Sequence, residues 1–425
     1  RNGGNDAMEL NTLVVEGGRK ISGTVRVGGA KNSSLPLIAA ALLTAGTSTI
    51  EDVPRLKDIE TMRGVVEALG ARVIMEDNVM TVDSSSLNGN EPPYDLVRAM
   101  RASFLVMGPL LARMGSAHIF QPGGCAIGAR PIDLHLKGFA ALGAEIDMSG
   151  GVVKAKVSGR LKGERVYLDF PSVGATENIM MAAATAEGRT LIENAAREPE
   201  IVDLANFLNK MGAKVRGAGT PMLRIDGVDT LVPSSHTVIP DRIEAGTFMI
   251  IAAGTQGSLY IDNVVGEHVK PLEAKLSEAG AHVETFEGAM RVSADKRLKA
   301  VDVTTMPYPG FPTDMQAQLM AVLCTSEGTS QVTENVFENR FMHAPELSRM
   351  GANIKISGRT AIIEGVPTLT GAQVNATDLR ASAALVTAAL TAEGETHIHN
   401  ISHLDRGYEN FEGRLAKCGA RMRRE

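Results

Sequence analysis

The chain has 425 residues, of which 44% are hydrophobic and 22% are charged, and its formal net charge is -6. This length is sufficient for two or more domains, each with its own core. Because only 4% of the residues are aromatic and no basic block is present, the composition argues against a nucleic-acid-binding protein. No run approaches the roughly 18 apolar residues of a membrane span, and no signal peptide is visible, so we expect a cytoplasmic protein without membrane insertion.

The ends of the chain and its cysteines limit the fold further. Residues 1–7 are polar and precede Met8, so we expect a tag remnant or an extension and leave them out of the fold. The three cysteines are too few, and odd in number, for a disulfide framework, which indicates a reducing compartment. Cys324 and Cys418 lie in apolar stretches and are expected in the core. Only Cys125 has a reactive-looking context.

A short signature divides the chain into six copies of one unit. In each copy a Gly-Ala pair, preceded by an apolar or sulfur-containing residue, is followed by a short strand-like tail. The glycines are 68 to 73 residues apart, which indicates a repeated unit of about 70 residues. They are Gly70, Gly143, Gly212, Gly280, Gly351 and Gly419.

A second signature, a glycine followed by an alternating strand, confirms this register. It begins at Gly46, Gly115, Gly188, Gly257, Gly328 and Gly394. An apolar run long enough for a helix precedes each glycine, and an amphipathic segment such as 58–69 or 201–211 follows each strand. These apolar runs are 35–43, 104–111, 179–186, 248–253, 315–324 and 381–392.

Each unit is therefore predicted to fold as helix, strand, helix, strand. The first helix is apolar on nearly all sides and should be buried, whereas the second should lie outside. A glycine after the second helix is the expected C-terminal stop. The simplest arrangement is an α/β protein of two domains, each with three units, and a cleft between them. The proline-bearing stretch 231–240 marks the expected crossover.

The stretches before the six buried helices are the first candidates for function. They are rich in capping residues, and a helix N-terminus offers free N–H groups to an anion, so they would suit phosphorylated substrates. Each basic residue near them could instead be a surface charge or an ion-pair partner, as Arg406 beside Asp405 illustrates. Their repeated placement favours anion binding for the group, which comprises Lys31, Arg101, Arg130, Arg340, Arg380 and Arg406.

A glycine-rich stretch, residues 121–135, carries Cys125 directly after two glycines. Glycines allow the backbone to approach a ligand closely, which is typical of a loop. Positive charge on Arg130 and Lys137 would favour a reactive thiolate at Cys125. The alternative is a glycine-rich turn with an incidental small apolar residue, and this stretch alone leaves both interpretations open.

With these features together, the sequence resembles the enolpyruvyl transferase family from about Leu13 to Gly419. The resemblance is closest to the members that act on UDP-N-acetylglucosamine. The sister members acting on shikimate 3-phosphate share the architecture but not the cysteine loop. The most specific motifs are G-G-A-K-N-S, R-A-M-R-A-S, P-G-G-C-A-I-G-A-R-P-I-D-L-H, S-V-G-A-T, N-A-A-R-E-P-E-I-V-D, F-P-T-D-M-Q-A-Q, V-F-E-N-R-F-M-H, D-L-R-A-S-A and D-R-G-Y-E.

The resemblance implies two inside-out α/β barrel domains, each of three repeated units with pseudo-threefold symmetry. Residues 30–238 would form the N-terminal domain with the cysteine loop, and residues 8–29 with 239–425 the C-terminal domain. The implied reaction transfers the enolpyruvyl group of phosphoenolpyruvate to the 3-hydroxyl of UDP-N-acetylglucosamine and releases phosphate by addition-elimination. This is the first committed step of peptidoglycan synthesis, and no cofactor is implied.

Roles for individual residues follow from the resemblance alone. Cys125 would be the general acid for C3 of phosphoenolpyruvate and the target of fosfomycin, and Asp314 the base. Considered without the family, an aspartate in F-P-T-D would more often be an N-cap. Lys31, Arg130 and Arg406 would hold the phosphate, Arg340 and Arg380 the carboxylate, and Asn32 would lie near the reacting hydroxyl. The UDP-sugar site would comprise Arg101, Arg130, Pro131, Ile132, Asp133, Leu134, Ser172, Val173, Gly174, Asp314 and Val336.

Some features depart from this pattern or stay unassigned. Phe170 occupies a position where some family members carry a lysine, so one charge contact to the nucleotide is in doubt. His397 and His399 share a strand face without a third ligand nearby, and we expect no metal site. A non-catalytic paralogue that binds a sugar nucleotide remains an alternative function. The oligomeric state is not predictable from the sequence.

Overall fold

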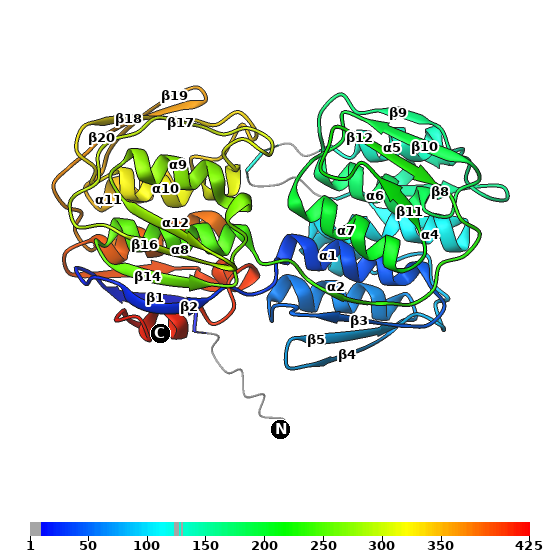
Figure 1. Ribbon diagram of the computed structural model, residues 1–425, viewed down its shortest axis with the longest axis horizontal. Coiled ribbons are helices and arrows are strands. Elements are labelled where there is room, and N and C mark those ends of the chain that lie inside the picture. The colour runs from blue at the N-terminus through cyan, green and yellow to red at the C-terminus, as the bar shows by residue number, and fades with distance from the viewer. Residues whose placement is uncertain (1–9, 123–126, 129–130) are drawn as a thin grey trace. The chain divides into compact units, whose positions relative to one another are not determined.

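The computed structural model describes residues 10–122, 127–128 and 131–425. The chain forms two compact units (Figure 1). Unit 1 contains residues 10–27 with Arg242–Met306 and Gly310–Glu425, and unit 2 contains Gly28–Asp241 with Pro307–Pro309. No helix in the described part of the chain is long and apolar enough to cross a membrane.

Unit 2 contains the first three repeats. The first has α1 (Lys31–Ala40), η1 (Ala41–Leu43), β3 (Thr47–Glu51), α2 (Lys57–Ala68), β4 (Arg72–Glu76) and β5 (Val79–Asp83). The second has α3 (Tyr94–Ala99), η2 (Arg101–Val106), α4 (Met107–Met114), β6 (Ser116–Phe120), α5 (Asp133–Ala141), β7 (Glu145–Asp147), η3 (Ser149–Gly151) and β8 (Val152–Lys156). The third has β9 (Arg165–Tyr167), α6 (Val173–Ala183), β10 (Arg189–Glu193), α7 (Pro199–Lys210), β11 (Lys214–Arg216), β12 (Met222–Asp226) and β13 (Ser235–Thr237).

Unit 1 contains the other three repeats and the start of the described chain. The start supplies β1 (Thr12–Glu16) and β2 (Ser22–Arg26). The fourth repeat has α8 (Arg242–Gly254), β14 (Ser258–Asp262), η4 (Gly266–Val269), α9 (Lys270–Glu278), β15 (His282–Phe286) and β16 (Ala289–Ser293). The fifth has β17 (Val303–Thr304), η5 (Thr313–Met315), α10 (Gln316–Leu323), β18 (Thr329–Thr333), α11 (His343–Arg349), β19 (Asn353–Ser357) and β20 (Thr360–Glu364). The sixth has β21 (Gln373–Asn375), α12 (Leu379–Thr391), β22 (Glu395–His399), η6 (Ile401–Arg406), α13 (Phe411–Ala416) and β23 (Arg421–Arg424).

Each repeat forms its own small sheet, so the described residues of each unit contain three sheets. In five of the six sheets a further short strand of the same unit joins in parallel, as β2 joins β14 and β17 joins β18. The sixth repeat has one strand, β23, after its outer helix, and β1 supplies the missing one by pairing antiparallel with both β22 and β23. The two ends of the described chain therefore close one sheet of unit 1.

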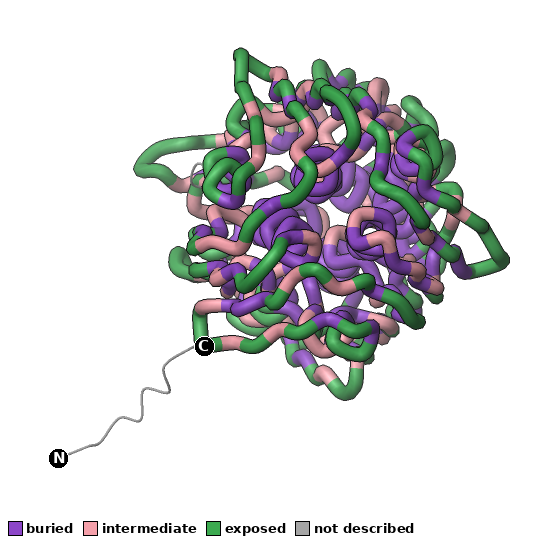
Figure 2. Tube along the Cα trace, turned by 90° about the vertical axis from the view of Figure 1, so that its left-hand side faces the viewer, coloured by how far each residue is buried: buried purple, intermediate pink, exposed green. Residues whose placement is uncertain are grey.

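The apolar first helix of each repeat lies in the core, as the sequence predicted. In unit 1, α8, α10 and α12 contact one another, and every residue of α12 from Leu379 to Leu390 is buried. Figure 2 shows the buried helical turns in the interior and exposed hairpins around them. Helices inside and sheets outside are the reverse of an ordinary α/β barrel, which is the arrangement that the sequence analysis expected. A hydrophobic cluster fills the core of each unit.

Two local expectations need correction. The final strand of a repeat is a hairpin of two strands in the first five repeats, for example β4 with β5, because a tight turn lets the chain return along the same sheet. The helix starts were expected to be rich in capping residues; side-chain caps are present at Ser172 and Asp378, whereas Ala30 and Met315 are N-caps without a side-chain hydrogen bond. The six repeat glycines, Gly70 to Gly419, do have the predicted left-handed conformation, with φ of 98° to 108°.

Candidate active site

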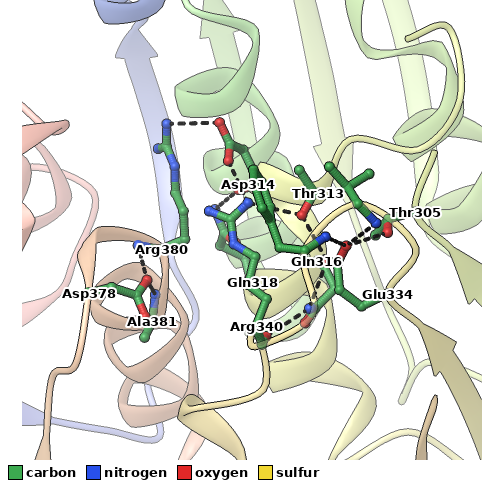
Figure 3. Close-up of polar contacts among 12 residues, drawn as sticks. Thr305, Thr313, Asp314, Gln316, Gln318, Glu334, Arg340, Asp378, Arg380 and Ala381 are labelled. Atoms are coloured by element: carbon green, nitrogen blue, oxygen red, sulfur yellow. Dashed lines mark hydrogen bonds and ion pairs between the residues drawn. The ribbon is translucent and has the colours of Figure 1, made fainter. Parts of the chain in front are cut away.

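Unit 1 brings together three of the predicted site residues, Asp314, Arg340 and Arg380 (Figure 3). The Asp314 carboxylate lies 2.8 Å from Arg340 Nη1 through one oxygen and 3.6 Å from Arg380 Nη2 through the other. The two arginine side chains are only 7% and 5% exposed, whereas that of Asp314 is 27% exposed. Two guanidinium groups held this deeply favour an anion, and a partly exposed carboxylate beside them is accessible to a substrate hydroxyl.

Helix α12 and a tyrosine position Arg380. Asp378 caps this helix, and its Oδ1 accepts hydrogen bonds of 3.0 Å from the backbone N–H groups of Arg380 and Ala381. The side chain donates from Nη1 to the hydroxyl oxygen of Tyr408 at 3.2 Å, and its guanidinium carbon lies 5.7 Å from the Tyr408 ring centre. Tyr408 is 2% exposed and its hydroxyl also contacts Thr247 Oγ1 at 2.8 Å. Arg380 is the second residue of a capped, buried helix, so its backbone is held rigidly.

Glu334 anchors the loop residues around Arg340. It is 1% exposed, and its carboxylate accepts from the hydroxyls of Thr305 and Thr313, both at 2.7 Å. It also accepts from Gln316 Nε2 at 3.2 Å (Figure 3). Sequence analysis missed this residue. Strand alternation would have pointed to it, because every second residue along β18 and just after it is buried, namely Ser330, Val332 and Glu334.

In unit 2, Lys31 begins α1 and lies in a buried ion pair. Its ammonium nitrogen is 3.1 Å from Asp58 Oδ2 on α2, and the two side chains are 10% and 5% exposed. The backbone N–H of Lys31 also points to Asp241 Oδ2 at 3.4 Å. Asn32, the next residue, is half-buried. An ammonium held this way at a helix N-terminus is suited to binding an anion.

The predicted nucleotide stretch Ser172 to Gly174 forms the start of α6. Ser172 caps the helix by accepting from the N–H of Ala175 at 3.2 Å. A Cβ atom on Gly174 would lie 3.1 Å from Cε1 of His135, so this glycine permits close contact with a ring on α5. His135 is in turn 3.0 Å from Asn178 Nδ2 through Nδ1.

The tautomer of His135 follows from this network. Asn178 Oδ1 accepts from the N–H of Gly108 at 2.8 Å, which fixes the orientation of the amide. The Asn178 Nδ2 group therefore faces His135 and donates to Nδ1, so the neutral ring carries its proton on Nε2. This ties the starts of α5 and α6 together, and with them the Asp133 to Leu134 stretch and the Ser172 cap.

The structure also places the remaining predicted residues that it describes. Arg101 is half-buried at the start of η2, Pro131 and Asp133 are exposed, and Ile132 is buried. Arg406 is half-buried at the end of η6. Its neighbour Asp405 binds Arg424 Nη2 and Nη1 at 2.6 and 2.8 Å. Val336 is half-buried, Leu134 and Val173 likewise, and Cys125 and Arg130 lie outside the described residues.

Burial shifts the pKa of two groups, His343 and Glu177. Burial lowers the pKa of His343 to about 4, with Asp378 opposing and Arg340 adding to the shift. Burial also raises the pKa of Glu177 well above its ordinary value, and the negative charges of Glu200 and Glu198 add to the effect. His343 is therefore neutral in the folded chain near pH 7.

The other cysteines behave as core residues. Burial raises the pKa of the Cys324 thiol to about 12 and also raises that of Cys418. Within the described ranges no group of three or more His, Cys, Asp or Glu could hold a metal ion. His399 instead lies 3.1 Å from Thr12 Oγ1 and 2.6 Å from Gln373 Oε1, as strand cross-links. Two surface hollows, of about 340 and 420 Å³, lie near Arg63 and Arg160 and contain none of the predicted site residues.

Comparison with known proteins places these features in a family. The family model described as EPSP synthase (3-phosphoshikimate 1-carboxyvinyltransferase) matches residues 15–415. The chain is 60% identical to UDP-N-acetylglucosamine 1-carboxyvinyltransferase 2 of Carboxydothermus hydrogenoformans, over 98% of this chain and 99% of the relative. It is 58% identical to UDP-N-acetylglucosamine 1-carboxyvinyltransferase 1 of Halalkalibacterium halodurans, over 98% of this chain and 94% of the relative.

Solved structures agree with the sequence relatives. The crystal structure of the enolpyruvyl transferase NikO from Streptomyces tendae matches with a TM-score of 0.88 at 27% identity, over 97% of this chain and 98% of that one. An EPSP synthase from Acinetobacter baumannii matches with a TM-score of 0.76 at 19% identity, over 97% and 100%, and supports the fold alone. The chain belongs to the enolpyruvyl transferase family.

Proposed function

We propose that this chain transfers the enolpyruvyl group of phosphoenolpyruvate to the 3-hydroxyl of UDP-N-acetylglucosamine and releases phosphate. This would be the first committed step of peptidoglycan synthesis. The observation that carries the proposal is the Asp314 carboxylate between two buried arginines, in a chain that matches relatives of this activity over nearly its full length. The motif pattern favours the UDP-sugar over shikimate 3-phosphate as acceptor.

The chemistry needs one acid, one base and several cations. In the addition, the sugar oxygen bonds to C2 of phosphoenolpyruvate while C3 gains a proton. In the elimination, C3 loses a proton and the C2–O bond to phosphate breaks. We assign the acid to Cys125 and the base to Asp314, whose partly exposed carboxylate supports this role.

Cations stabilise the charge on the small substrate. We assign the phosphate to Lys31, Arg130 and Arg406, and we place Asn32 near the reacting hydroxyl. The buried pair Arg340 and Arg380 would bind the carboxylate, since planar guanidinium groups match carboxylates bidentately. The UDP-sugar is assigned to Arg101, to 130–134, to Ser172, Val173 and Gly174, and to Asp314 and Val336.

The proposal also covers domains and location. We assign residues 30–238 to one domain and residues 8–29 with 239–425 to the other, and we place the reaction in the cytoplasm. The close approach of Gly174 to the His135 ring supports a shaped, backbone-lined subsite. Such a subsite could bind the nucleotide despite Phe170, which is 45% exposed, in place of a lysine.

The test is release of inorganic phosphate from phosphoenolpyruvate with UDP-N-acetylglucosamine, and in parallel with shikimate 3-phosphate. We expect release with the UDP-sugar only. Release with shikimate 3-phosphate only would assign the chain to the sister activity, and tight UDP-sugar binding without release would favour a non-catalytic binder. Full turnover in Cys125→Ala, or an unchanged mass after incubation with fosfomycin and UDP-sugar, would overturn the role of Cys125.

A further inference from the structure

Comparison of the six repeats identifies Glu334 as an exception. Six residues after the strand-opening glycine, four repeats carry Asp52, Asn194, Asn263 or Asn400, each with a positive φ of 56° to 62°. Aspartate and asparagine tolerate this left-handed conformation better than other residues with a side chain. The second and fifth repeats have Gln121 and Glu334 at this position, and neither is among the described non-glycine residues with positive φ; of these two, only Glu334 is buried.

The side chain at this position has a different task in the fifth repeat. Asn194 and Asn263 each donate from Nδ2 to a backbone carbonyl of the neighbouring segment, at Leu168 and Val27, both at 2.8 Å. These are simple links at the end of a strand. Glu334 accepts from Thr305, the corresponding neighbour, and also from four further groups around Arg340. The side chain at this position therefore makes one hydrogen bond in those two repeats and several in the fifth repeat.

Three routes connect Glu334 to Arg340. The Thr313 hydroxyl donates to Glu334 Oε1 at 2.7 Å and accepts from Arg340 Nη1 at 2.9 Å. Gln316 Nε2 donates both to Glu334 Oε1 at 3.2 Å and to the backbone oxygen of Arg340 at 3.0 Å. The N–H groups of Val336 and Phe337 donate to Glu334 Oε2 at 2.9 and 3.2 Å, and the Phe337 ring lies 5.2 Å from the Arg340 guanidinium carbon.

The direction of the Thr313 hydrogen bond is determined by its neighbours. A guanidinium can only donate and a carboxylate can only accept, so the single hydroxyl proton must point to Glu334 and a lone pair to Arg340. Arg340 Nη1 carries two hydrogens, and this nitrogen also lies 2.8 Å from Asp314 Oδ1. Glu334 is thus connected through the Thr313 hydroxyl to the same nitrogen of Arg340 that contacts the Asp314 carboxylate.

We propose that Glu334 is a positioning residue for the enolpyruvyl transfer, acting on Arg340 and Asp314 through the Thr313 hydroxyl. The inference rests on the proposed function, because it takes its reaction and the roles of Arg340 and Asp314 from there. Glu334→Gln keeps the shape of the side chain but replaces one carboxylate oxygen with an NH₂ group, which would face groups that also donate. The Oε2 side faces two backbone N–H groups, which can only donate, so the NH₂ group would face Thr313 and its hydroxyl would lose its acceptor.

The test is steady-state kinetics of phosphate release by the full chain with Glu334→Gln. We expect kcat to fall and KM for phosphoenolpyruvate to rise, with kcat/KM lower by about 10- to 100-fold, since a misplaced catalytic group of this kind costs up to about 100-fold. A matched pair separates the hydroxyl from the volume of the side chain. Thr313→Val should reproduce much of this loss, whereas Thr313→Ser, which keeps the hydroxyl, should retain most of the activity.

The double variant Glu334→Gln/Thr313→Val decides whether the two residues act together. If Glu334 acts through Thr313, the double variant loses little more than the larger single loss, whereas independent effects would multiply. Asn263→Gly is the control for a mere strand-end link, because it removes the equivalent side chain in a neighbouring repeat. We expect it to lower the melting temperature without changing kcat or KM.

The outcomes separate the inference from the function on which it rests. A wild-type chain that releases no phosphate with the UDP-sugar overturns the proposed function itself. An active wild type with equally active Glu334→Gln and Thr313→Val variants overturns only the positioning role. If Glu334→Gln does not fold, the Thr313 pair decides: equal kinetics of Val and Ser variants would count against the inference, and rescue by serine would support it.

Discussion

The ammonium of Lys31 lies 3.1 Å from the carboxylate of Asp58, and both side chains are at most 10% exposed. Removing one partner from a buried ion pair leaves a charge poorly compensated in a medium of low polarity. We expect Asp58→Asn to lower the free energy of unfolding by about 3 kcal/mol, measured by denaturant unfolding. KM for phosphoenolpyruvate should also rise, because Lys31 would lose its orientation.

An exposed pair provides the control for that prediction. Arg63 Nε lies 2.7 Å from Glu67 Oε1, with side chains 31% and 44% exposed. Solvent screens such a pair, so Glu67→Gln should change stability by about 0.5 kcal/mol or less and leave kinetics as they were. Equal losses of unfolding free energy for Asp58→Asn and Glu67→Gln would show that burial does not increase the contribution of the ion pair.

Tyr408→Phe tests the support of Arg380. The change removes a hydroxyl that accepts from Arg380 Nη1 at 3.2 Å and keeps the ring beside the guanidinium. A hydrogen bond to a charged group is worth about 1.5 kcal/mol, so we expect KM for phosphoenolpyruvate to rise roughly tenfold. Tyr260→Phe, on the half-buried surface of β14, should leave KM as in the wild type. No change in either variant would mean that Arg380 is held without Tyr408.

His343 gives the fold a pH dependence of known sign. Its folded pKa is about 4, mainly because it is buried, against an ordinary value of 6.5. The unfolded chain takes up the proton first, so this contribution to stability is complete above pH 6.5 and is lost as the pH falls toward 4. The loss amounts to about 3 kcal/mol. Between pH 7 and pH 4.5 the free energy of unfolding should fall less in His343→Gln than in the wild type. The same fall in both proteins would contradict the assignment.

Glu177 should produce the opposite trend. Burial, with Glu200 and Glu198 nearby, raises its folded pKa well above the ordinary value of 4.5. Ionisation therefore costs more in the folded chain, and this cost is present at high pH and disappears as the pH falls to 4.5. Glu177→Gln should be more stable than the wild type at pH 8, with the gain shrinking at lower pH. A gain that does not vary with pH would instead indicate an effect on packing.

The sequence alone was enough to determine the repeat pattern, and the family resemblance added the arrangement of the repeats. The repeat period, the buried helices, the positions of the outer helices and the left-handed glycines such as Gly70 and Gly419 depend on local pattern, because apolar spacing and backbone freedom act over a few residues. The family resemblance also selected Asp314, Arg340 and Arg380, which the structure brings together.

Other features depend on pairings between distant segments, which no local pattern encodes. Only the tertiary structure showed that β1 closes the sheet of β22 and β23, that Asp58 neutralises Lys31, and that Glu334 gathers donors from residues 305 to 337. Alternation along β18 places Glu334 on the buried side of the strand, but no local pattern shows its partners. Its role appears only when the fold buries it and surrounds it with groups that must donate.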